Sequence, residues 1–156
     1  MLQARKVLCL DWDKRSLRLV VARLSGGRAV LEDAHAHRLP PEIDASDPEK
    51  LGAFIAHMLE RHRIRQKRVV VDVPRDQAVI NRLRLPPTPP EEVAAAVRFQ
   101  AQRELPFPIE EAEVDYAVMA TDDGGAVTEV LMVGVRRSTL DAIVATCTAA
   151  GLTPTR

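Results

Sequence analysis

The sequence predicts a mixed α/β chain of two small lobes, and three observations carry this prediction. Residues 1–39 contain three short apolar runs with strand character, separated by turn residues. Apolar residues at helical spacing follow in residues 47–63, and a run of valines comes after them. Pro74 ends the valine run, because a proline cannot extend a central strand. The predicted parts are a first domain over residues 1–76, a second part over residues 77–136, termed the insert below, and a last helix within residues 137–156.

The first domain is predicted to open with an antiparallel meander of three strands. The apolar runs cover residues 6–11, 17–24 and 29–39. Gly26 and Gly27 stand between the last two runs, and a Gly-Gly pair suits the tight turn of a hairpin.

A helix and a buried strand are predicted to complete this domain. Ser46 and Glu49 have the spacing of a capping box, so the helix is expected to begin there and to run to about Arg63. Residues 69–73 are apolar on both faces, which favours a strand covered on both sides in a sheet joined by a crossover helix.

The insert is predicted to be built around one helix within residues 83–109. Thr88 and Glu91 form a second capping box, which gives the helix a definable start. Pro106 and the proline two residues later cannot continue a helix, so the helix is expected to end near Leu105. Its length would be about four turns.

Strands are predicted on both sides of this helix. Residues 78–85 alternate between apolar and polar side chains, and residues 114–120 and 127–135 form a hairpin across an Asp-Asp-Gly-Gly turn. Ser138 is expected to cap the last helix, and Gly151 to supply the left-handed residue at its end.

The composition excludes several classes of protein. The 22 basic and 22 acidic side chains balance, and no charged tail is present to attract nucleic acid or anionic lipid. The apolar runs are far shorter than the ~20 residues of a membrane-spanning helix, and the N-terminal run is too short for a signal peptide. Cys9 and Cys147 lie in apolar contexts typical of free, reduced thiols. We therefore expect membrane contact only through partners.

Four local strings match a known pattern. They are VLCLD at residues 7–11, RLRLP at residues 82–86, QRELPF at residues 102–107 and AAGL at residues 149–152. With the order of elements, these strings resemble the PilM family of type IV pilus assembly proteins, and more distantly FtsA and the type II secretion L proteins. The resemblance covers nearly the whole chain but less than half of a family member. We therefore expect an N-terminal fragment.

The resemblance implies a fold and a function. The first domain would be part of an actin-like, ribonuclease H-like subdomain, and the insert a strand-helix-strand-strand module of SHS2 type that serves contacts rather than chemistry. The helix of residues 137–156 would return to the first subdomain, after which the fragment ends. The protein would be a non-catalytic scaffold of a pilus or type II secretion platform, cytoplasmic and peripheral to the inner membrane. Self-association stays open.

The implied partner is the cytoplasmic N-terminal tail of a bitopic inner-membrane protein. In the resembled family a groove between the first subdomain and the insert holds this tail. The corresponding positions here are Val73, Pro74, Val79, Leu85, Pro86, Phe99, Leu105 and Phe107.

A phosphate loop is the first candidate for chemistry. Nucleotide-binding relatives have an Asp-x-Gly string followed by small hydroxyl residues in the first hairpin. Asp11 matches this pattern, but Asp13 replaces the glycine and Lys14 replaces a small residue before Ser16. A carboxylate at this glycine position repels phosphate, so the string favours a degenerate loop and a chain that does not hydrolyse ATP alone. The alternative is a nucleotide switch that binds ATP and Mg²⁺ in a longer form.

The histidines do not predict a metal site. His35 and His37 alternate onto one strand face, but the sequence offers no third ligand near them. His57 and His62 are five residues apart on a helix, so they do not share a face and are expected to add nothing. A solvated strand face is the favoured interpretation.

The other charged segments and the serines are predicted to lie at the solvent-exposed surface without a binding or catalytic role. The basic segment 61–68 has no interleaved aromatic residues, so nucleic-acid binding is not predicted. No Gly-x-Ser-x-Gly elbow is present, and the acidic segment 110–115 is expected to be an exposed loop and strand edge.

Overall fold

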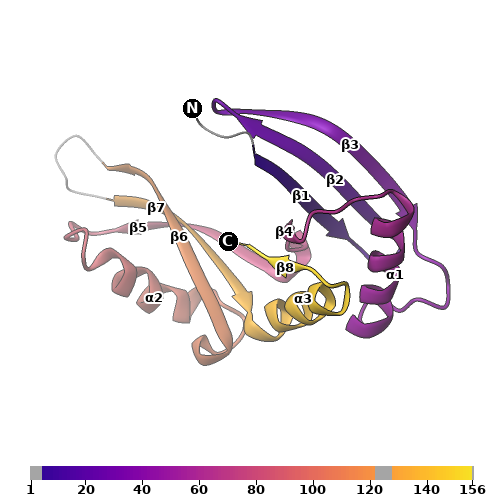
Figure 1. The fold of residues 1–156 in the computed structure, drawn as a ribbon. Helices are drawn as coiled ribbons and strands as arrows, with labels where there is room; N and C mark the ends of the chain where they lie inside the picture. The colour runs from indigo at the N-terminus through magenta and orange to yellow at the C-terminus, as the bar shows by residue number, and fades with distance from the viewer. Residues whose placement is uncertain (1–4, 122–127, 156) are drawn as a thin grey trace. The chain divides into compact units, whose positions relative to one another are not determined.

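The structure, a computed structural model, describes residues 5–121 and 128–155 (Figure 1). The chain forms two compact units. Unit 1 comprises Met1–Pro74 and Asp141–Arg156, and unit 2 comprises Arg75–Leu140. Within the described residues, no helix has both the length and the apolar character that a membrane span requires.

The sheet of unit 1 is an antiparallel meander extended by parallel strands. Its strands are β1 (Arg5–Trp12), β2 (Ser16–Ser25), β3 (Arg28–Arg38), β4 (Arg68–Val71) and β8 (Thr153–Pro154). They lie in the order β3-β2-β1-β4-β8, with β4 parallel to β1 and β8 parallel to β4. Gly26 and Gly27 form the β2–β3 turn with φ of 56° and 74°, values that favour glycine. The predicted meander and its turn are confirmed.

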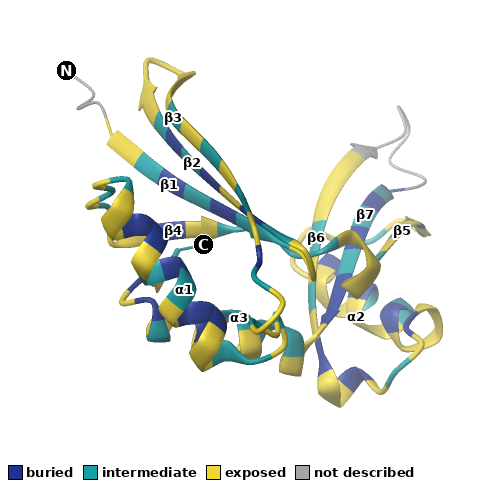
Figure 2. Cartoon of the chain, turned by 90° about the vertical axis from the view of Figure 1, so that its right-hand side faces the viewer, coloured by how far each residue is buried: buried dark blue, intermediate teal, exposed yellow. Residues whose placement is uncertain are grey.

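Helices cover one face of this sheet. α1 (Pro48–Arg61) and the part of α3 (Arg137–Ala149) that belongs to unit 1 pack on the face formed by alternate residues of β1 and β2 (Figure 2). The core members are Leu8, Leu10, Leu17, Leu19, Val21, Leu39, Leu51, Ile55, Met58, Leu59, Val69, Cys147, Ala150 and Leu152.

The strand β4 is less covered than its sequence predicts. Val69 is buried against the helices, but Val70 on the opposite face keeps 42% of its surface exposed. The expectation of a strand covered on both sides was therefore wrong. The valines suit a strand through their β-branched side chains, whether or not both faces are buried.

Unit 2 is a three-stranded antiparallel sheet with a helix on one face. Its strands are β5 (Ala78–Leu85), β6 (Ala112–Thr121) and β7 (Thr128–Arg136), in the order β5-β7-β6. The helix α2 (Val93–Glu104) follows β5, and short 3₁₀ turns, η1 (Arg75–Gln77) and η2 (Ile109–Glu111), precede β5 and β6. The turn predicted at 122–125 lies outside the described residues.

The core of unit 2 is separate from that of unit 1. Its buried members are Leu83, Leu85, Val93, Val97, Ala101, Leu105, Ile109, Ala112, Val130 and Met132. Leu105 ends α2 with an extended backbone, as the prolines after it predict. Gly134 gives the Leu105 side chain room, because a β-carbon there would collide with its methyl group.

The helices begin differently from the prediction. In α1 the N-cap is Asp47, whose carboxylate accepts from the amides of Glu49 and Lys50, each at 3.1 Å. The hydroxyl of Ser46 instead donates to Asp44. The predicted capping box was therefore wrong by one residue, because an aspartate directly follows the serine and caps at least as well.

The start of α2 differs from its predicted position by more residues than the start of α1 does. The Thr88 hydroxyl donates to the carbonyl of Pro86 at 2.7 Å, so it does not cap a helix. A turn from Pro89 to Glu92 follows, and α2 begins at Val93 without a side-chain cap among the described residues. The helix is thus shorter than the predicted four turns.

The last helix also starts without the predicted cap. α3 begins at Arg137, directly after β7, so Ser138 lies within the helix. Its end agrees with the prediction, because Gly151 has φ of 68° and its amide donates to Thr148.

Candidate functional site

The turn between β1 and β2 holds the residues predicted as a phosphate loop. The amide of Asp13 donates to the carbonyl of Ser16 at 3.0 Å, which closes the turn. One carboxylate oxygen of Asp13 accepts from the amides of Arg15 at 2.7 Å and Ser16 at 2.9 Å. Successive backbone amides of this kind form the concave sites that bind anions in phosphate loops. Here the protein's own carboxylate occupies them.

Arg18 joins both aspartates of this turn. Its guanidinium donates to Asp11 at 2.5 Å and to Asp13 at 2.6 Å. The hydrogen bond from the Arg15 amide, then that from Arg18, lowers the pKa of Asp13 below its ordinary value. The same pairs raise the pKa of Arg18. Arg18 and the two aspartates therefore form a charged network across this turn.

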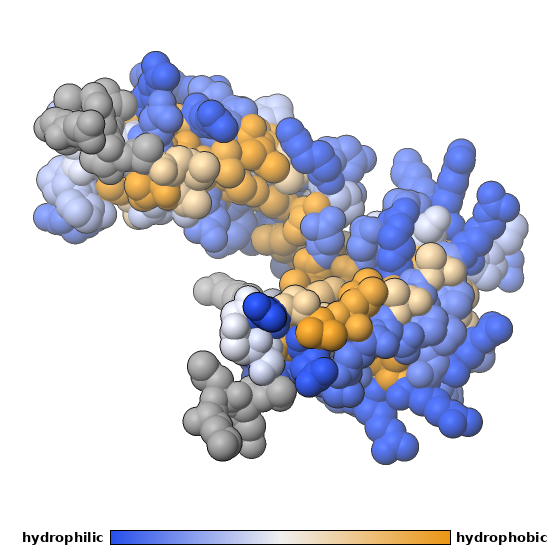
Figure 3. Space-filling model, turned by 90° about the horizontal axis from the view of Figure 1, so that it is seen from above, coloured by the Kyte–Doolittle hydropathy of each residue, from blue (hydrophilic) through white to orange (hydrophobic). Residues whose placement is uncertain are grey.

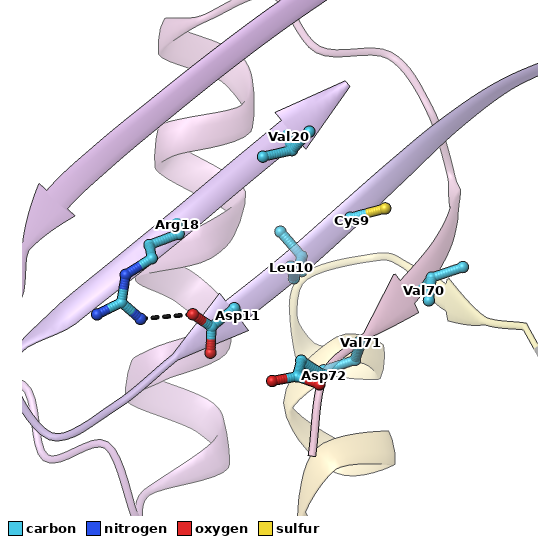
Figure 4. A pocket seen from close by; sticks show the side chains of 8 residues that line it. All are labelled: Cys9, Leu10, Asp11, Arg18, Val20, Val70, Val71 and Asp72. Carbon is cyan, nitrogen blue, oxygen red and sulfur yellow. Dashed lines mark hydrogen bonds and ion pairs between the residues drawn. The ribbon is translucent and has the colours of Figure 1, made fainter. Parts of the chain in front are cut away.

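A hollow of about 310 Å³ lies beside this network in unit 1 (Figure 4). Asp11 and Asp72 come from the ends of the neighbouring parallel strands β1 and β4. The other lining residues are Cys9, Leu10, Arg18, Val20, Val70 and Val71. The hollow is thus mostly apolar, with its charged groups at one end.

A phosphate at this turn would compete with the Asp13 carboxylate. A phosphate would have to displace the Asp13 carboxylate from the Arg15 and Ser16 amides, and Asp13 would then face it as a second anion. Lys14 is exposed and Ser16 is half-buried. The structure therefore brings together the predicted residues Asp11, Asp13 and Ser16. Their carboxylates and backbone amides are bonded to other groups of the same hairpin.

A cluster of three histidines forms a second polar feature in unit 1. The Nε2 atoms of His37 and His62 are 2.9 Å apart, and the rings of His35 and His62 stack with centroids 3.5 Å apart. Each residue offers one ring nitrogen, and the three nitrogens lie within 4.8 Å of one another. The expectation that His62 adds nothing was therefore wrong.

The cluster was missed because its members come from different elements. His35 and His37 lie on β3, whereas His62 is the C-cap of α1, which packs on the same sheet. Helical spacing relates His62 only to His57, which is exposed on the same helix. The signal that could have found the cluster was a histidine at the end of the helix that follows the histidine-bearing strand.

Two histidines of this cluster, His37 and His62, have pKa values below the ordinary value for histidine. Burial is the main cause that lowers the pKa of His37, and the charges of His62 and Arg61 add to it. Burial also lowers the pKa of His62, followed by the effects of His35 and Arg61. Neutral imidazoles can accept a proton or bind a metal ion through a free nitrogen lone pair.

Comparisons with known proteins decide the family. The sequence profile of the type IV pilus assembly protein PilM matches residues 9–155. This chain belongs to the PilM family. No match was found among curated proteins. The resemblance to PilM inferred from local strings is confirmed.

Two solved structures share the fold of this PilM family member. A chain in the structure of a PilM-PilN type IV pilus biogenesis complex is 26% identical to it, with a TM-score of 0.82 over 96% of this chain and 46% of that chain. The cytoplasmic domain of EpsL, an inner-membrane component of the Vibrio cholerae type II secretion system, is 15% identical, with a TM-score of 0.63 over 97% and 56%. The second likeness concerns the fold alone.

These comparisons confirm the expected α/β, actin-like class of fold. The PilM family member described here spans about half the length of both structures that it resembles.

The residues expected at the PilM-type partner site fall into different environments. Val73 and Pro74 are half-buried at the end of unit 1, and the remaining positions belong to unit 2. Leu85 and Leu105 are buried in the core of unit 2, so their side chains are not at the surface. The structure therefore does not present all of these side chains for contact.

The remaining expected positions reach the surface of unit 2. Phe99 is 58% exposed on α2, Pro86 is exposed after β5, and Val79 is half-buried. Phe107 is half-buried, with the guanidinium of Arg136 at 4.3 Å from its ring centroid. Apolar side chains reach the surface in both units, so exposure alone does not single out a contact site (Figure 3).

Proposed function

We propose that this chain is part of a non-catalytic scaffold in type IV pilus assembly that binds the cytoplasmic N-terminal tail of a bitopic inner-membrane protein. The observation that carries the proposal is its likeness, over 96% of its length, to a chain from a PilM-PilN complex. The partner in this proposal is PilN or a protein of the same kind. The scaffold would lie at the cytoplasmic face of the membrane and would reach it only through this partner.

The internal bonding of the β1–β2 turn supports a role without catalysis. Asp13 holds the two amides that a nucleotide phosphate would need, and Arg18 pairs with both aspartates of the turn. Breaking these bonds would cost free energy before any phosphate is bound. A protein that acts by binding partners does not need this turn to open.

Phe99 is the strongest candidate for an anchor in partner binding. It lies on α2, whose opposite side is fixed in the core by Val93, Val97 and Ala101. The guanidinium of Arg103 lies 5.4 Å from the Phe99 ring centroid, which supports the ring without burying it. An exposed aromatic side chain on a rigid helix fits the usual composition of binding hot spots.

Titration of the full-length protein with a labelled tail peptide tests the proposal. We expect saturable binding, and we expect Phe99→Ala to weaken the affinity about tenfold or more, as truncation of a hot-spot aromatic does. Leu31→Ala is the matched control, because Leu31 is 63% exposed on β3 in unit 1. Fluorescence anisotropy measures both variants.

Two outcomes would contradict parts of this proposal. If the intact protein shows no saturable binding of the tail peptide, the proposed scaffold function is wrong. If the tail binds but Phe99→Ala and Leu31→Ala behave alike, the function stands and the Phe99 surface is not the contact.

A nucleotide switch is the second candidate, and one observation favours it. Asp11 and Asp72 flank the 310 Å³ hollow from adjacent parallel strands, where carboxylates could hold Mg²⁺ through water. Calorimetry of the full-length protein with Mg-ATP separates the two candidates. The scaffold predicts no heat of binding for the natural sequence, and a measured heat would favour the switch.

A further inference from the structure

We propose that His35, His37 and His62 form a binding site for one divalent transition-metal ion, with Zn²⁺ as the reference ion, that fastens the end of α1 to β3. This site lies entirely within unit 1. It is distinct from the β1–β2 turn and from the proposed partner surface on α2. The inference does not depend on the proposed function.

The distances between the ligand atoms fit a metal site that is nearly assembled. In a tetrahedral zinc site with Zn–N bonds of ~2.0–2.1 Å, two ligand nitrogens are ~3.4 Å apart. The Nε2 atoms of His37 and His62 are 2.9 Å apart, and all three ligand nitrogens fall within 4.8 Å. The rings of His35 and His62 are stacked, so they would rotate out of this stack for both lone pairs to point at one ion.

Two elements position these rings, β3 for His35 and His37 and the end of α1 for His62. His35 and His37 are two residues apart on β3, so their side chains leave the same face of the sheet. His62 is fixed by the end of α1, where Arg63 has φ of 56° and the Ile64 amide donates to Leu59 at 2.8 Å. This is the hydrogen bond of a Schellman motif, which stops the helix at His62.

The conformation of Arg63 is an independent sign that this helix end is constrained. A left-handed backbone is unfavourable for a residue other than glycine, because the β-carbon approaches the following carbonyl oxygen. Arg63 nevertheless adopts it, and Ile64 then packs against the core of unit 1. The sharp turn keeps His62 directly beside the strand.

Asp33 completes the environment of the cluster. It lies on β3 two residues before His35, and its Oδ1 atom is 2.8 Å from Nε2 of His35. This Nε2 atom is buried, and among the described residues it has no partner in hydrogen-bond geometry. A carboxylate beside a ligating histidine commonly orients the ring through the nitrogen that does not bind the metal. With Nε2 turned to Asp33, Nδ1 remains for the ion.

The chemistry of the donors indicates the class of ion. Three imidazoles suit Zn²⁺, Cu²⁺ and Ni²⁺, whereas Mg²⁺ and Ca²⁺ prefer oxygen ligands. The half-buried rings leave a fourth position for water. Asp33 also supplies negative charge that offsets Arg61 near the cluster.

Metal titration of the untagged protein tests this inference. We expect one Zn²⁺ per chain by calorimetry, a higher melting temperature with Zn²⁺ than with Mg²⁺, and a visible absorption band with Co²⁺ as a spectroscopic substitute. Alanine variants of His35, His37 and His62 should each weaken Zn²⁺ binding at least tenfold. His57→Ala is the matched control, because His57 is exposed on the same helix and lies outside the cluster.

The variants must also be shown to fold. Circular dichroism of each metal-free variant provides this check, and His62→Gln replaces His62→Ala if the alanine variant does not fold. The inference is overturned if the natural sequence binds no Zn²⁺ saturably. It is also overturned if His62 variants bind Zn²⁺ as tightly as the natural sequence, or if His57→Ala weakens binding to the same extent.

Discussion

Gly52 is a residue whose missing side chain decides how closely two helices of unit 1 approach. A β-carbon at this position of α1 would lie 2.8 Å from the carbonyl oxygen of Thr146 and would collide with Ala149, both on α3. We expect Gly52→Ala to lower the free energy of unfolding by about 2 kcal/mol, because a backbone atom cannot move aside. Urea unfolding measures this change.

Gly134 provides the comparison for that variant. A β-carbon there would meet only the end of the Leu105 side chain, which can rotate. We expect Gly134→Ala to cost less than Gly52→Ala. An equal or larger loss in Gly134→Ala would show that the Leu105 side chain is as rigid as the backbone of α3.

Single residues also mark where the sequence was informative. Asp13 was identified from a replaced glycine, and the structure adds that its carboxylate binds the Arg15 and Ser16 amides. His62 was dismissed because sequence spacing reports only neighbours on the same helix. Its actual neighbours are on β3, and contacts between elements far apart in sequence depend on how the helix packs.

At the scale of elements, the cap of α1 makes the helix sensitive to acid. The hydrogen bond from the Lys50 amide is the main cause that lowers the pKa of Asp47. A lowered pKa means that the stabilisation is fully present above the ordinary value of 3.8 and is lost as the pH falls through the folded-state pKa. We expect Asp47→Asn to be less stable than the natural sequence at pH 7, with the difference disappearing in strong acid.

Denaturant unfolding across this pH range measures the effect, and Asp47→Ala tests the cap itself. Alanine removes the acceptor as well as the charge, so it should be less stable than Asp47→Asn at every pH. If the two variants are equally stable at pH 7, the hydrogen bonds to the Glu49 and Lys50 amides contribute little.

The sequence predicted which elements exist better than where they begin. Strand periodicity, the Gly26-Gly27 turn and Pro106 were local signals, and the structure confirms each. The helix starts were mispredicted because several candidate caps compete within a few residues. Thr88 met the spacing rule, but its hydroxyl bonds to the carbonyl of Pro86, which the spacing rule does not consider.

At the scale of the whole molecule, unit 2 interrupts unit 1 in sequence. Unit 1 needs residues from both ends of the chain, because Cys147, Ala150 and Leu152 belong to its core and β8 pairs with β4. Proline and periodicity suggested the boundary at 76, and the family resemblance suggested the boundary at 136; the two compact units divide after Pro74 and after Leu140. No local signal announces that the final segment returns to the first sheet, and that expectation came from family resemblance.

This interruption predicts which segments fold alone. Residues 75–140 hold a continuous sheet, helix and core, so we expect them to unfold cooperatively when expressed by themselves. Residues 1–74 lack β8 and the α3 part of their core, so we expect them to be unfolded or to expose apolar surface. Joining residues 1–74 to 137–156 through a flexible linker should restore folding, as followed by circular dichroism and thermal unfolding. The contrary outcome is that residues 1–74 alone unfold cooperatively at the same temperature as the joined form. Burial of the apolar side chains of the returning segment would then have no measurable effect on the stability of unit 1.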